Sequence, residues 1–152
     1  MIARVLHARA ELARRGGDPG AAARLLERAM ALGVETTAQF GALLRVELAR
    51  VSPEPAAPLR QARELMAGCS DRTVRASVLE GVAERVPPLP AAELLGAARA
   101  LRGISESADP HVYALTARCA QALGAEVCQA ALARGATIPD PEKYALERLL
   151  PA

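Results

Sequence analysis

Three glycines at equal spacing place the strongest constraint on what this chain can fold into. Gly33, Gly68 and Gly103 lie 35 residues apart, and each closes an alanine-rich stretch: GAAARLLERAMALG, PAAPLRQARELMAG and PAAELLGAARALRG. Glycine is favoured just beyond the end of a helix, where the backbone turns left-handed. A fourth, shorter stretch, GAEVCQAALARG, ends at Gly135. Self-similarity at a period of about 20–50 residues is typical of repeat proteins, whose units bury their apolar faces against one another.

The prolines mark the opposite ends of the helices. A proline inside a helix loses a hydrogen bond and clashes with the preceding turn, whereas the first helical position tolerates it. Three prolines follow an aspartate, whose side chain can accept hydrogen bonds from the free N–H groups of a helix N-terminus. These pairs are Asp18-Pro19, Asp109-Pro110 and Asp140-Pro141, and each predicts the start of a helix.

The segments between the glycine-terminated stretches have helical periodicity. Val74, Val78 and Val82, for example, recur every four residues and share one helix face. Residues that favour strands are scarce, because the chain has two tyrosines, one phenylalanine and no tryptophan. We therefore expect first helices over Ile2–Arg15, Thr37–Val51, Asp71–Val86 and Pro110–Leu123, and a short last helix over Pro141–Leu150 that covers the open end of the stack.

Together these elements predict an all-α fold of stacked antiparallel helical hairpins, about four in number with a period near 35 residues, plus a short C-terminal capping helix. We expect one helical-repeat domain over residues 1–152, with units at approximately 1–35, 36–70, 71–105 and 106–138 and the cap at 139–152. A glycine inside a helix costs about 1 kcal/mol relative to alanine. Gly41, Gly81 and Gly96 therefore predict close approach between helices.

The stretch that begins at Gly17-Asp18 resembles the tetratricopeptide repeat family. In that family Gly-Asp precedes the second helix of a unit, and small, large and small residues follow at spacings of four and three. Here the matching residues are Ala22, Leu26 and Ala29, and the third unit repeats the spacing with Ala91, Leu95 and Ala98. The second unit departs from it near Ala57, Gln61 and Glu64, and only Phe40 stands for the aromatic anchors of the family. The period spans most of the chain, but the specific motif is present in only one or two units, so another α-solenoid or a compact bundle of hairpins stays an alternative.

The resemblance implies a superhelix whose concave wall is lined by the first helix of each unit and binds peptides or helices of other proteins. In the first unit the wall positions fall on Arg4, His7, Glu11, Arg14 and Arg15. Independently of the family, these five residues form one polar stripe at helical spacing. The corresponding candidates on later units are Arg45, Arg72 and Arg75.

Several arginines in one groove favour an acidic or carboxylate-bearing partner segment. The competing interpretation is a solvated helix face on which Glu11 and Arg15 pair at i,i+4. Nucleic acid is a disfavoured partner, because the net charge is only +2 and the chain lacks both a strong basic stripe and stacking aromatics.

The remaining patterns argue against a membrane protein and against a secreted one. Apolar stretches are far shorter than the roughly 20 residues of a transmembrane helix. The N-terminal segment has no continuous apolar region of the kind that a signal peptide needs. Cys69, Cys119 and Cys128 form an odd set without paired spacing, as in proteins of a reducing cytoplasm. We expect a cytoplasmic location.

No arrangement of residues predicts catalysis. The segment SESADPH contains Ser, Asp and His, but its Asp109-Pro110 pair is better explained as a helix start. His7 and His111 are the only histidines, no cluster has zinc-ligand spacing, and GGDPG lacks the Lys-Ser/Thr of a phosphate-binding loop. We therefore expect neither enzymatic activity nor a cofactor or metal.

The sequence predicts a protein–protein interaction module, such as an adaptor, chaperone or scaffold, that binds a partner peptide or helix on its concave face. One alternative is a structural module whose apolar ends self-associate, so that an oligomer is the working form. A second alternative is a helical regulatory domain that contacts nucleic acid through Arg4, Arg14, Arg15, Arg72 and Arg75.

Overall fold

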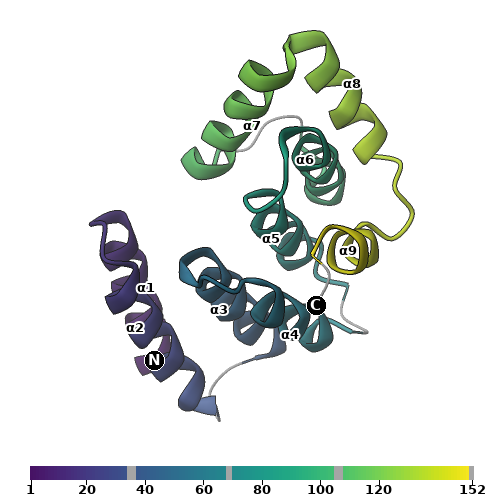
Figure 1. Cartoon of the computed structure of the whole chain (residues 1–152). Helices are drawn as coiled ribbons and strands as arrows, with labels where there is room; N and C mark the ends of the chain where they lie inside the picture. The colour runs from purple at the N-terminus through teal and green to yellow at the C-terminus, as the bar shows by residue number, and fades with distance from the viewer. Residues whose placement is uncertain (34–36, 68–69, 105–107, 151–152) are drawn as a thin grey trace. The chain divides into compact units, whose positions relative to one another are not determined.

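The computed structural model of the chain describes residues 1–33, 37–67, 70–104 and 108–150 (Figure 1). All regular structure in these ranges is helical, which confirms the predicted all-α class. Gly68 and Cys69, which entered the sequence predictions as a helix stop and a buried thiol, lie outside the described residues. No described helix is both long enough and apolar enough to cross a membrane.

The chain divides into two compact units, Met1–Asp71 and Arg72–Ala152. Each unit has its own internal packing, and we describe each by itself. The single domain expected over residues 1–152 therefore stays a prediction. Both units begin with a pair of helices that pack against each other, as the repeat predicts.

The first unit consists of two helical pairs. Helices α1 and α2 form the first pair, α3 and α4 form the second, and α2 packs against α3. The helices are α1 (Ile2–Arg15), α2 (Pro19–Ala31), α3 (Ala38–Val51) and α4 (Ala56–Leu65). The sequence-predicted bounds of the first helix are those of α1.

Alanines and leucines form the core of the first unit. Ala22, Leu26 and Ala29 are buried on α2, as the resemblance implies for these positions. They belong to one cluster with buried residues of α1 and α3, namely Ala3, Leu6, Ala10 and Leu44. Alanines at a helix contact allow short interaxial distances, near the lower end of the usual 8–10 Å.

Helix α4 turns a different face to the core than the repeat predicts. Ala57, Gln61 and Glu64, which occupy the positions equivalent to the α2 seam, are all exposed. The buried positions are Pro58, Leu59, Ala62 and Met66 instead. The polar side chains at positions 61 and 64 favour solvent, so the helix presents the adjacent residues to its neighbours.

The predicted helix ends are largely confirmed. The carboxylates of the three Asp-Pro pairs accept hydrogen bonds from the backbone N–H groups of Ala21, His111 and Lys143. Gly103 ends α6 in the left-handed conformation with φ of +70°, and Gly33 also has positive φ. Two of the three glycines whose 35-residue spacing predicted the repeat therefore have the positive φ expected at a helix end.

The second unit is organised around α6. This helix contacts α5, α7 and α8, and residues on most sides of it are buried. The elements are α5 (Arg72–Ala83), α6 (Pro88–Arg102), α7 (Pro110–Leu123), α8 (Ala125–Gly135), α9 (Pro141–Tyr144) and a π-helical turn, η2 (Ala145–Leu149). Helix α5 ends before Val86, which we had included, because Pro87 disfavours a helical conformation of the residue before it.

Helices α6 and α8 meet backbone against backbone. A Cβ atom at Gly96 would lie 2.0 Å from the carbonyl oxygen of Leu132, and one at Gly135 would lie 1.8 Å from the carbonyl oxygen of Glu93. The close approach predicted from Gly96 is confirmed. Helix α8 ends at Gly135, as predicted, but φ there is not positive, and the missing side chain makes room for α6.

The C-terminal segment docks on the beginning of the second unit. Helix α9 and η2 pack against α5 (Figure 1), whereas the sequence analysis expected a helix that covers the open end of the stack. Ala145 and Leu146 are buried. The helix itself was predicted correctly, and its docking depends on polar partners described below.

Candidate functional site

The five predicted wall residues of the first unit share one side of α1. We call Arg4, His7, Glu11, Arg14 and Arg15 the α1 stripe. Arg4 and Arg15 are exposed, and the other three are half-buried. The core residues of α1 lie on a different side of the helix, so the stripe is free to face solvent or a partner.

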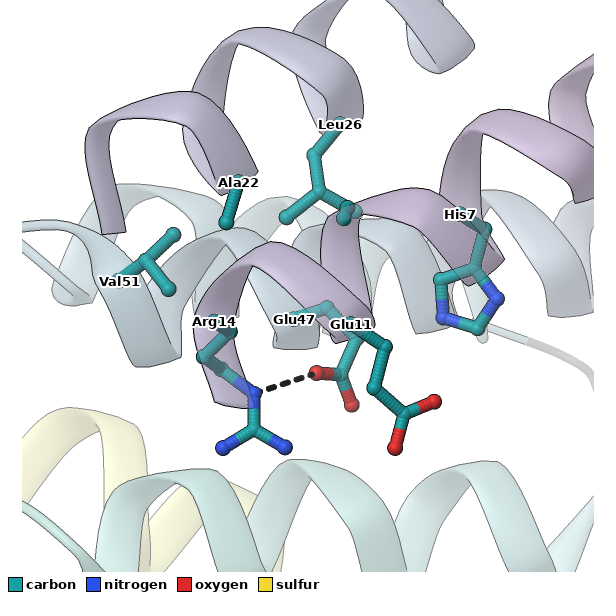
Figure 2. Close-up of a pocket in the computed structure, with 8 residues that line it drawn as sticks. His7, Glu11, Arg14, Ala22, Leu26, Glu47 and Val51 are labelled. Atoms are coloured by element: carbon teal, nitrogen blue, oxygen red, sulfur yellow. Dashed lines mark ion pairs between the residues drawn. The ribbon is translucent and has the colours of Figure 1, made fainter. Parts of the chain in front are cut away.

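Arg14 is electrostatically compensated by an acid that the sequence analysis missed. Its Nε atom lies 4.0 Å from a carboxylate oxygen of Glu47 on α3, as Figure 2 shows. Glu47 also pairs with Arg50 one turn further along its own helix. The spacing of three between Glu47 and Arg50 was visible in the sequence, but the contact with Arg14 requires the packing of α1 beside α3.

Arg15 pairs with Glu11 on the same helix at i,i+4. This contact is the one expected of a solvated helix face. Exposed pairs of this kind contribute about 0.3–0.5 kcal/mol, so a partner's carboxylate could displace Glu11 at small cost. Arg15 therefore stays a candidate anchor, at the small cost of giving up this pair.

Arg4 and His7 both contact Phe40, the only phenylalanine of the chain. The His7 and Phe40 rings meet edge to face with centroids 5.7 Å apart, and the Arg4 guanidinium carbon lies 6.0 Å from the Phe40 ring centre. Among the described residues Arg4 has no ionic partner. Its N–H donors thus remain open to a ligand while the aromatic ring orients the side chain.

A shallow hollow lies between α1, α2 and α3. Its floor is apolar, and its rim carries His7, Glu11, Arg14 and Glu47 (Figure 2). The floor residues are Ala10, Ala22, Leu26 and Val51. The hollow measures about 180 Å³ only when space open to solvent is included, and it encloses no room for a water molecule. It is a surface depression against which a side chain of a bound segment can pack, and it is not a pocket that encloses a cofactor.

Arg45 lies on α3 and contacts α4, its partner in the second pair of helices. Its guanidinium donates to the Gln61 side chain on α4 at 3.2 Å and to the Gly41 carbonyl of its own helix at 3.1 Å. The structure therefore gives Arg45 a role in joining α3 to α4. It is not among the residues that line the hollow.

Arg72 and Arg75 belong to the second unit, and both have partners there. Arg72 donates to the Ala100 carbonyl oxygen at 3.0 Å. Arg75 binds both carboxylate oxygens of the buried Glu142. Hydrogen bonding to Glu142 raises the pKa of Arg75 despite the opposing effect of burial. This pair fastens α9 to α5.

Two further acids of the second unit have arginine partners. Glu80 is 3% exposed, and its carboxylate binds the Arg102 guanidinium through two hydrogen bonds of 2.9 and 2.8 Å. Glu93 accepts from Arg134 at 3.2 Å and from the Tyr144 hydroxyl at 3.4 Å. Burial, together with the nearby Glu93 charge, raises the pKa of Tyr144. The sequence analysis proposed none of these pairs.

Chemistry-bearing side chains do not gather elsewhere in the described ranges. Within them, no three His, Cys, Asp or Glu side chains are placed to hold a metal ion. Cys119 and Cys128 are buried, free thiols, and burial raises the pKa of Cys119. His111 places its Nε2 atom 2.9 Å from Glu84, a contact between α7 and the chain just after α5.

No protein-family model, no curated protein and no solved structure matches the chain. The resemblance to tetratricopeptide repeats accordingly depends on the residues quoted above. Within the first unit, the α1 stripe occupies one side of its helix, and its Arg4 and His7 contact Phe40.

Proposed function

We propose that the chain is a degenerate tetratricopeptide-like protein of the cytoplasm that binds a segment of another protein through its first unit. The buried α2 seam of Ala22, Leu26 and Ala29 supports the repeat assignment. Adaptor, assembly chaperone and scaffold are the roles that such a module performs, and all three need the same property, a surface that receives a partner's side chains.

The observation that carries the proposal is the hollow beside the α1 stripe. An apolar floor with a charged rim allows an apolar side chain of the partner to pack against the depression while neighbouring polar groups fix its orientation. Arg15 is paired with Glu11, and Arg14 shares the single charge of Glu47 with Arg50. Arg4, held against Phe40, is therefore the residue we assign as the anchor for a partner's carboxylate.

The nucleic-acid alternative has less support than it had from the sequence. Four of its five arginines have intramolecular partners: Arg14 faces Glu47, Arg15 pairs with Glu11, Arg72 donates to a backbone carbonyl, and Arg75 binds Glu142. Phosphate binding would have to compete with these contacts, and counterion release per arginine would be smaller.

Site-specific photo-crosslinking tests the proposal. A photo-reactive phenylalanine analogue replaces Arg15, at the exposed end of the α1 stripe, and in a matched control it replaces Arg24, which is exposed on α2. We expect one protein to crosslink in cells from position 15 and not from position 24, and Arg4→Glu to abolish that product. The absence of any product from position 15, or the same product from both positions, would contradict the proposal.

A further inference from the structure

Helix α1 has a second exposed side that the sequence analysis did not identify. Ile2, Val5 and Leu12 are 62, 54 and 68% exposed. Their spacings of three and seven residues place Val5 and Leu12 on the same side of the helix, with Ile2 at its border. We call these three residues the α1 apolar edge. The core face of the same helix is supplied by Ala3, Leu6 and Ala10, so the edge is not required for packing within the first unit.

Isolated apolar side chains on a surface are ordinary, whereas a row of large ones along one helix marks an interaction site. Helices that bind in grooves or pair with another helix make contact through residues at spacings such as i, i+3, i+7 and i+10. Val5 and Leu12 occupy the second and last of these positions, and the third is Arg9.

The charges around the edge are mostly positive. Helix α1 carries four arginines and one glutamate, and Glu11 is already paired with Arg15. Arg4 and Arg15 lie between the edge and the hollow, and Arg9 lies in the edge itself. Among the described residues Arg4 and Arg9 have no ionic partner. A segment that covers the edge therefore meets uncompensated positive charge at Arg9 within the edge and at Arg4 on one flank.

The charges help to decide which molecule covers the α1 apolar edge, a second copy of this chain or a helix of another protein. Arg9 is at the middle of the edge, so a two-fold axis through it would bring the Arg9 side chains of two copies together. Like charges in an interface are unfavourable by several kcal/mol at worst. A helix with apolar residues at matching spacing and with acidic residues on its flanks has the opposite effect, because each arginine gains a partner.

We propose that the α1 apolar edge docks an acidic amphipathic helix of a partner protein. This inference deepens the proposed function and depends on it, since Arg4 borders both the edge and the hollow. It adds the partner's secondary structure and charge: a helix with a leucine-type stripe and glutamates on either side.

The test uses the full chain and two synthetic fluorescent helical peptides. One has leucines at i, i+3, i+7 and i+10 flanked by glutamates, and the other replaces each glutamate by lysine. Fluorescence anisotropy should show binding of the glutamate peptide only. Removal of two large apolar contacts in Val5→Gln with Leu12→Gln should weaken it at least about tenfold, whereas Tyr113→Gln, which alters an exposed ring of α7, should leave it unchanged.

Equal binding of both peptides, or full binding by the double variant, would overturn the inference. So would a concentration-dependent dimer, or binding to anionic lipid vesicles, that the double variant abolishes. If a crosslinked partner is lost in Arg4→Glu but retained by the double variant, the proposed function stands and the edge inference fails. If wild-type protein neither crosslinks from position 15 nor binds the glutamate peptide, both fail.

Discussion

The two units use arginine in different ways. In the first unit Arg4 and Arg15 are exposed and their contacts are a ring face and a surface pair. In the second unit Arg75 and Arg102 bind buried carboxylates. Because a buried carboxylate is costly unless it is paired and hydrogen-bonded, the second group is committed to structure. The first group is available to a ligand.

Glycine shows the same contrast. In the second unit Gly96 and Gly135 allow two helix backbones to touch. In the first unit a Cβ atom at Gly41 would lie 3.3 Å from the end of the Leu65 side chain and 3.6 Å from the Arg45 guanidinium, and both side chains can move. The α6–α8 contact thus has little tolerance for an added methyl group, whereas the contact of α3 at Gly41 has some.

The largest expected effect comes from filling the α6–α8 contact. Gly96→Ala or Gly135→Ala places a methyl carbon within 2.0 Å of backbone, so α8 must move away from α6. Overpacking of this severity should lower the free energy of unfolding by about 3 kcal/mol or more. Gly41→Ala, the matched control in the first unit, should change it by less than about 1 kcal/mol. Urea denaturation measures the free energy of unfolding of all three variants. If Gly41→Ala destabilises the chain as much as Gly96→Ala or Gly135→Ala, the two units do not differ in their tolerance of a larger residue.

The next effect concerns the buried carboxylate of Glu80. Arg102→Met leaves that charge without its two hydrogen bonds, and breaking a buried pair costs about 3–5 kcal/mol when both groups are fully buried. Arg102 is 21% exposed, so we expect about 2–3 kcal/mol. The control Arg15→Met breaks an exposed pair of the first unit and should cost no more than about 0.5 kcal/mol. Thermal and urea denaturation measure both variants. If Arg102→Met and Arg15→Met lower the free energy of unfolding by the same amount, Glu80 does not depend on Arg102 for its place in the fold.

Docking of the C-terminal segment should depend on one carboxylate. Glu142→Gln removes the charge that binds Arg75, and hydrogen bonds to charged groups contribute about 1.5–3 kcal/mol; one-third exposure of Arg75 places the expected loss near the lower value. Hydrogen exchange should show faster exchange in α9 and α5 with α1 unchanged. Unchanged protection of α9 would mean that its apolar contacts alone hold it.

The smallest effect is a pH dependence of the second unit. The pKa of Tyr144 is raised above its ordinary value of 10.0, so its neutral phenol stabilises the folded chain fully below pH 10. That stability is lost as the pH rises through the folded-state pKa, because the unfolded chain gives up the proton first. In a Tyr113→Phe background, phenolate absorbance reports Tyr144 alone. Glu93→Gln should move its titration towards lower pH, and no movement would exclude the Glu93 contribution.

Local signals in the sequence predicted the helices well. Gly103 and the Asp-Pro pairs act within a few residues of where they stand, so their effect does not depend on the rest of the fold. The bounds of Ile2–Arg15 and Pro110–Leu123 were predicted to the residue. The α1 stripe could also be predicted, since helical spacing alone places its five side chains on one side.

Contacts between distant residues could not be predicted in this way. Glu142 and Arg75 are 67 residues apart and Glu80 and Arg102 are 22 apart, and no periodicity connects either pair. Arg75 looked like a wall residue because an arginine on an amphipathic helix gives the same pattern whether it faces solvent or a buried acid. The different register of α4 and the packing role of Gly135 likewise depend on neighbours that the sequence pattern does not specify.

The central claim is that Arg4 and Arg15 of the α1 stripe serve binding, whereas Arg75 and Arg102 of the second unit serve structure. Its most direct test compares Arg4→Gln with Arg75→Gln, in the background that carries the crosslinker at position 15, by measuring crosslinked partner and unfolding free energy together. The account predicts that Arg4→Gln abolishes the crosslink and changes stability by no more than about 0.5 kcal/mol. It predicts that Arg75→Gln keeps the crosslink and destabilises the chain by about 1–2 kcal/mol. Loss of stability in Arg4→Gln with the crosslink retained, or loss of the crosslink in Arg75→Gln alone, would contradict it.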